Sequence, residues 1–189
     1  SMIKRMISAM LLKPELYGEV ESDRSATSQG VLVVLISGIA TGVAFLSIGI
    51  EKETQEQIMD AFLFGIAFRL LGWILLSATI SFVGTKLFPA PDTDSDWSEL
   101  SRTIAFAHSP AILIIFGVIG LLGGLQIIFW IVAIATLILQ MVATVIAVKH
   151  ALNYTTTMRT VVVTVLSYIP YVGVISLLYP LLSRGADLS

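Results

Sequence analysis

The sequence has 189 residues, of which 56% are hydrophobic and 13% are charged, whereas a soluble domain has about 45–50% apolar and about 25% charged residues. These proportions exclude an ordinary soluble fold. The formal net charge of −2 provides no basic field over the chain, so we expect no nucleic-acid partner. There is no cysteine, which excludes disulfides, thiolate metal ligands and thiol nucleophiles.

The first 28 residues carry an amphipathic pattern ahead of the first membrane span. Apolar residues at positions 3, 6, 7, 10 and 11 fall on one face of a helix, while Lys4 and Arg5 fall on the other. This pattern fits a helix in the cytoplasmic interface that is attracted by anionic lipid headgroups. It fits equally well a helix packed on the bundle's own cytoplasmic face. We therefore predict that residues 1–28 form a cytoplasmic amphipathic segment.

Five apolar stretches are long enough to cross a bilayer, which takes roughly 20 helical residues for about 30 Å of hydrocarbon. They cover approximately residues 30–50, 59–87, 103–122, 125–148 and 161–182. They are apolar at successive positions, unlike the alternating strands of a barrel, and in lipid only helices then satisfy the backbone. We predict an all-α integral membrane protein with a five-helix domain over residues 29–184 and a tail over residues 185–189.

The basic residues predict the orientation of the chain in the bilayer. Eight of the eleven fall on one side: Lys4, Arg5, Lys13, Arg24, Lys86, Arg102, Lys149 and Arg159. Lys52 and Arg184 fall on the other side, and Arg69 lies inside a span. Because basic loops favour the cytoplasm, we expect a cytoplasmic N-terminus and an external C-terminus.

Glycines at close spacing predict tight helix packing. Gly123 and Gly124 join the third and fourth spans, which makes these spans antiparallel neighbours. Gly38 and Gly42 form one GxxxG pair, and Gly120 and Gly124 form another, a spacing that lets helix backbones approach closely. We expect these glycines to pack helices within one chain, with a homo-oligomer as the alternative.

Arg69 is the most informative residue inside a predicted span. An arginine at that depth costs about 2.5–3.5 kcal/mol on insertion scales, so we expect its guanidinium to have polar partners. One interpretation is that it extends outward toward carboxylates of the external loop, Glu51, Glu53 or Glu56. The other is that it faces the bundle interior and contacts an anion or a lipid phosphate. Gln140, in the fourth span, is a second polar residue at membrane depth.

His108 and His150 are expected near the cytoplasmic boundary, at the start of the third span and the end of the fourth. Because these spans are neighbours, the two rings could approach each other. Two histidines lack an evident third ligand, so we predict no metal site and no cofactor. The sequence also shows no catalytic motif, and we do not expect an enzyme.

The segment before the third span carries a resemblance to a known family. Asp96 has the position of a helix cap, and Trp97 would lie at the cytoplasmic interface. The helix continues as Leu-Ser-Arg-Thr-Ile-Ala-Phe-Ala-His-Ser-Pro over residues 100–110. This stretch resembles the Yip family, multi-pass membrane proteins named as interactors of Ypt/Rab GTPases.

Two further stretches are similar to the same family. Residues 16–18, Leu-Tyr-Gly, match an Asp-Leu-Tyr-Gly-Pro segment of eukaryotic members, with departures at Glu15 and Glu19. Trp130 and residues 149–160 resemble the family's pattern around the loop after the fourth span. The short N-terminal arm is most similar to a prokaryotic member.

The resemblance implies a membrane scaffold or adaptor with a role in membrane trafficking and organisation. It implies that a protein partner binds at the cytoplasmic face, through Leu16, Tyr17, Gly18 and Trp97. The expected location is the plasma membrane of a prokaryote, or the Golgi or ER membrane of a eukaryote. The alternative is a small transporter, channel or lipid-moving protein with a polar path near Arg69 and Gln140.

Overall fold

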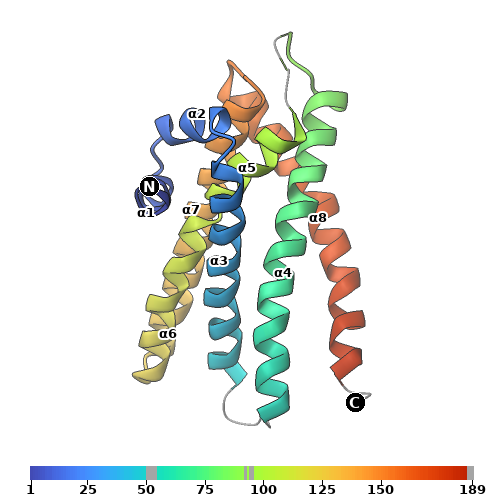
Figure 1. Cartoon of the computed structure of the whole chain (residues 1–189). Helices are drawn as coiled ribbons and strands as arrows, with labels where there is room; N and C mark the ends of the chain where they lie inside the picture. Colours follow the sequence, from blue (N-terminus) through green and yellow to red (C-terminus); the bar gives the residue numbers. More distant parts are fainter. Residues whose placement is uncertain (50–54, 92, 94–95, 187–189) are drawn as a thin grey trace.

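The computed structural model describes residues 1–49, 55–91, 93 and 96–186, and these form a bundle of long helices (Figure 1). The α-helices are α1 (Met2–Met10), α2 (Glu15–Ser22), α3 (Ala26–Gly49), α4 (Gln55–Phe82), α5 (Trp97–Ala107), α6 (Ile114–Leu122), α7 (Gln126–Ala151) and α8 (Thr157–Ala186). A π-helical turn, Val83–Leu87, follows α4, and a 3₁₀ turn, Ser109–Leu113, separates α5 from α6.

Within the part of the chain that the structure describes, five segments are long and apolar enough to cross a membrane, which confirms the predicted all-α, five-span fold. They are Ala26–Ala44, Phe62–Leu87, Trp97–Leu122, Gln126–Ala151 and Thr157–Val174. The short helices α1 and α2 lie toward one end of the bundle, and the described end of α8 lies at the other (Figure 1). The charge pattern remains the basis for predicting that the end with α2 is cytoplasmic.

The third span, predicted over residues 103–122 with Pro110 inside it, is broken into two helices. Helix α5 ends at Ala107, the 3₁₀ turn begins at Ser109, and α6 continues from Ile114. Pro110 lies in this turn, where it has no N–H to donate and its ring disfavours a continuing α-helix. Figure 1 shows α5 running obliquely across the upper end of the bundle, whereas α6 runs down beside α7.

Helices α1, α2 and α5 form the cap of the bundle, the term used below for this group. All residues from 100 to 111 are buried, so the end of α5 and the start of the 3₁₀ turn form the centre of the cap. The cap and the spans share a core that contains Ala9, Leu16, Tyr17, Val20, Ala26, Val33, Phe106, Ala107, Ala143 and Ala147. The N-terminal helices are therefore packed on the bundle itself.

Gly38 and Gly42 pack α3 against α4, within the chain. A Cβ added at Gly38 would lie 3.1 Å from Ile66 Cα, and one at Gly42 would lie 2.8 Å from the Phe62 carbonyl oxygen. Gly65, on α4, completes the contact, since a Cβ there would lie 2.5 Å from Gly42 Cα. The close approach of these two backbones leaves no room for side chains at the crossing.

The two glycines of the second pair, Gly120 and Gly124, have different roles. A Cβ at Gly120 would lie 2.7 Å from Ile128 Cγ2, so Gly120 packs α6 against α7. Gly124 has no atom within 4 Å of such a Cβ, and its φ of +75° is in the left-handed region. Its predicted role in helix packing is corrected, because this glycine supplies the backbone conformation of the α6–α7 turn instead.

Candidate functional site

Arg69, on α4, points into the bundle and joins three spans. Its Nε donates to Thr41 Oγ1 on α3 at 2.9 Å, and its Nη1 donates to Gln140 Oε1 on α7 at 2.9 Å. The structure therefore brings together the two polar residues that the sequence singled out at membrane depth. These two nitrogens are bonded inside the bundle and not toward the external loop. Of the glutamates named for the outward interaction, Glu51 and Glu53 lie outside the described residues, as does the side chain of Glu56.

The surroundings of Arg69 are polar and neutral. Tyr168 and Tyr171 on α8 and His108 lie within electrostatic range of its guanidinium. Among the described residues, the ion pairs are those of Arg5, and none includes Arg69. A partly buried guanidinium without a counter-charge is costly at membrane depth, and hydroxyl and amide oxygens compensate it only in part. This arrangement can attract an anion.

The two histidines have different neighbours. His108 is 3% exposed, and its Nδ1 donates to the carbonyl oxygen of Ile104 at 3.0 Å. His150, in the last turn of α7, stacks on Tyr17 with ring centroids 6.4 Å apart. The first histidine is thus part of the buried interior, while the second holds α2 against α7.

Only two of the four residues predicted to bind a partner lie on the surface. Leu16 and Tyr17 are 3% and 0% exposed, because α2 turns this face toward the shared core. Their predicted direct contact with a partner is corrected accordingly. Gly18 is exposed with open space beside it, and Trp97 is 44% exposed at the start of α5.

Arg102 stabilises the cap, although the sequence indicated only that it belongs to the basic residues of the predicted cytoplasmic side. It is 3% exposed, its Nη2 donates to the carbonyl oxygen of Glu21 at 2.5 Å, and its Nη1 donates to Thr27 Oγ1 at 3.2 Å. These bonds join α5 to α2 and to the start of α3. Counting basic residues predicts the orientation of the chain but cannot show that one of them, Arg102, is buried.

Two aromatic side chains also connect elements that the sequence left unrelated. Trp73 Nε1 donates to the carbonyl oxygen of Ser101 at 2.7 Å, which joins α4 to α5. The hydroxyl of Tyr154 lies 2.9 Å from the carbonyl oxygen of Gly84 and 2.8 Å from that of Phe88. Tyr154 lies in the loop between α7 and α8, so its hydroxyl joins this loop to the π-helical turn and to Phe88 directly after it.

Arg5 fastens α1 to the rest of the cap. Its Nη2 donates to Glu19 Oε1 at 2.7 Å and to Asp23 Oδ2 at 2.6 Å, and its Nη1 donates to Gln29 Oε1 at 3.0 Å. Hydrogen bonds from Ser25 and from Arg5 lower the pKa of the Asp23 carboxyl to about 2. These three acceptors hold α1 to α2 and to the start of α3.

Acid is expected to loosen α1. Because the pKa of Asp23 falls from 3.8 to about 2 on folding, its contribution to stability is complete above about pH 5 and is lost progressively as the pH falls toward 2. Hydrogen exchange of the α1 amides, corrected for intrinsic rates, should therefore accelerate over this range. The Asp23→Asn variant should exchange faster already at pH 5 and show a weaker pH dependence. Protection of α1 that is unchanged between pH 5 and pH 2 would contradict this role of Asp23.

Comparison with known proteins gives one match. Residues 9–177 match the family model described as the Yip1 domain, a range that begins near the end of α1, contains all of α2 and α5, and ends in α8. No curated protein matches the chain, and no solved structure matches it.

Proposed function

Because the chain belongs to the Yip1 domain family and is a multi-pass membrane protein, we propose that it acts as a membrane scaffold or adaptor and not as an enzyme. Its partner would be a protein that binds the cap, at the face predicted to be cytoplasmic. The resemblance described above supports a role in membrane trafficking and organisation. The plasma membrane of a prokaryote is the proposed location, or the Golgi or ER membrane in a eukaryote.

The packing of α5 is the observation that supports this proposal most. Its interior residues are buried against the other cap helices and the spans, and Trp73 and Arg102 fix it by hydrogen bonds. A helix held in this way presents its first residue, Trp97, on a rigid surface. Exposed indoles are common energetic centres of protein interfaces. The cap thus combines a fixed scaffold with an aromatic group available for binding.

Crosslinking in native membranes tests the adaptor role. We expect a specific protein to be recovered with the wild-type chain and recovery to fall by more than about tenfold with Trp97→Ala, the effect of losing an interface tryptophan. Phe116→Ala is the matched control, because Phe116 is 63% exposed on α6, away from the cap. Equal recovery with wild type and Trp97→Ala, or an equal loss with the control, would count against the cap as the binding surface. Tyr17→Ala is unsuitable, since this side chain is buried.

A second function is favoured by the environment of Arg69. Among the described residues, the guanidinium is bound by neutral oxygens at membrane depth. Such a group is suited to a transient anion, so we also consider a small transporter, channel or lipid-moving protein. Reconstituted vesicles that move neither anions nor lipids above the protein-free rate would remove this alternative. The variants that separate transport from stability are described in the Discussion.

A further inference from the structure

Helix α1 has two rows of apolar residues, one packed in the core of the cap and one largely exposed. Met2, Met6 and Ala9 face the core of the cap. Ile3, Ile7 and Leu11 form a second row, four residues apart, and are 65%, 50% and 61% exposed. At 1.5 Å per residue this row is roughly 12 Å long. A surface helix in water would carry polar residues there.

The surroundings of the row indicate that lipid covers it. Helix α1 lies across the direction of the spans and beside their upper part (Figure 1). Residues of the neighbouring spans, such as Leu32 and Met141, are exposed and apolar as well. In a multi-pass membrane protein these surfaces face hydrocarbon. An amphipathic helix at this level lies in the interface, with its apolar row toward the acyl chains.

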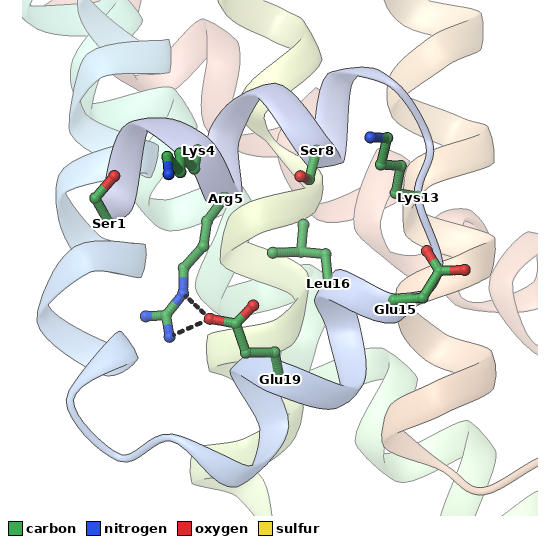
Figure 2. Close-up of a pocket in the computed structure, with 8 residues that line it drawn as sticks. All are labelled: Ser1, Lys4, Arg5, Ser8, Lys13, Glu15, Leu16 and Glu19. Carbon is green, nitrogen blue, oxygen red and sulfur yellow. Dashed lines mark hydrogen bonds and ion pairs between the residues drawn. The ribbon is translucent and has the colours of Figure 1, made fainter.

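A polar pocket opens beside this row. It has a volume of about 320 Å³ and lies between α1 and α2 (Figure 2). Its lining includes Lys4, Ser8, Lys13, Glu15 and the pair Arg5–Glu19. At 3.6 residues per turn, Lys4 and Ser8 border the row formed by Ile3, Ile7 and Leu11. The pocket and the apolar row are thus adjoining parts of one surface.

The charges of the pocket match a phosphodiester. Arg5 is already bound by Glu19 and Asp23. Within the described part of the chain, Lys4 and Lys13 form no ion pair, so two ammonium groups remain against the single carboxylate of Glu15. The ammonium groups and the Ser8 hydroxyl can donate to phosphate oxygens. Glu15 can accept a hydrogen bond from a headgroup hydroxyl.

We propose that the pocket between α1 and α2 binds the headgroup of an anionic glycerophospholipid such as phosphatidylglycerol, whose acyl chains follow the Ile3–Ile7–Leu11 row. The site depends on the membrane location of the chain and not on the adaptor role. This site would give α1 a function. Lipid binding by α1 would hold the cap at the level of the headgroups and make the position of the cap depend on the anionic lipid content of the bilayer.

Native mass spectrometry of the full chain from mixed phosphatidylglycerol and phosphatidylcholine nanodiscs tests the site. We expect wild type to retain phosphatidylglycerol preferentially and Lys4→Gln/Lys13→Gln to reduce this retention roughly 30-fold, since each basic residue near the surface contributes substantially to the attraction. The control is Arg24→Gln/Lys86→Gln, which removes the same charge from exposed positions outside the pocket. Melting temperatures confirm that each variant is folded.

The outcomes separate the site from its alternatives. Preferential retention that is lost only in the pocket variant supports the proposal. Equal loss in both double variants would indicate diffuse attraction and overturn a defined site, as would equal retention of the two lipids by wild type. Displacement of the lipid by equimolar glycerol phosphate would indicate a site for a soluble phosphate ester and overturn the lipid assignment. None of these results changes the outcome expected for the crosslinking test with Trp97→Ala, so the adaptor role is tested separately.

Discussion

The Gly65→Leu variant should fail to form the native bundle. A Cβ at this position would lie 2.5 Å from Gly42 Cα and 2.6 Å from Gly42 N, atoms of a backbone that no rotamer change can move. Extra carbon atoms in a packed interior commonly cost about 1–3 kcal/mol, and here two helix axes must separate. We expect a loss of at least about 3 kcal/mol in the free energy of unfolding.

Thermal unfolding in detergent, followed by size-exclusion chromatography, measures this effect. Gly173→Leu is the matched control, because a Cβ at Gly173 has no atom within 4 Å and this glycine is exposed on α8. The control should melt within a few degrees of wild type, since surface changes are usually within about 0.5 kcal/mol. Similar melting of the two variants would show that the α3–α4 crossing is looser than the structure indicates.

Replacing Arg69 with methionine should destabilise the bundle, and a second substitution should restore it. In Arg69→Met, Thr41 still donates to the Ser37 carbonyl oxygen at 2.9 Å, but Gln140 loses the guanidinium that donates to its amide oxygen. A buried polar group left without a partner costs about 1–3 kcal/mol. In Arg69→Met/Gln140→Leu both polar groups are gone, and most of the loss should be recovered.

A double-mutant cycle with Gln140→Leu as the other single variant measures this coupling. Independent, additive effects of the two substitutions would contradict a direct Arg69–Gln140 interaction. The restored double variant also separates the two candidate functions. It should be folded but lacks the Arg69–Gln140 pair, so a transporter that depends on this pair would lose anion or lipid flux in it, while an adaptor would retain its crosslinked partner.

The features that depend on local sequence were predicted well. A span needs a certain length of apolar residues in lipid, so all five spans could be read from hydropathy alone, to within a few residues for most ends. The amphipathic pattern of α1 and the Gly123–Gly124 turn are likewise local. The Yip resemblance rested on short segments of consecutive residues, and the match over residues 9–177 confirms it.

The features that depend on distant residues were missed or left open. The hydropathy of residues 103–122 is the same for a straight helix and for one broken at Ser109, so only the structure shows the oblique α5. Tyr17 and Arg102 were expected at or near a surface, and both are buried because α2, α3 and α5 meet around them.

Arg69 shows most clearly what the sequence determined and what only the tertiary structure decided. The sequence determined that a charge lies at membrane depth and that no acidic residue lies in the core of any span. It left open whether this charge extends outward or points inward. Tertiary structure decided the question, because Thr41 and Gln140 come from two other spans and meet Arg69 only when α3, α4 and α7 pack together. In lipid, hydrophobicity places each helix across the membrane, while close packing at small residues and polar contacts between helices determine which faces meet.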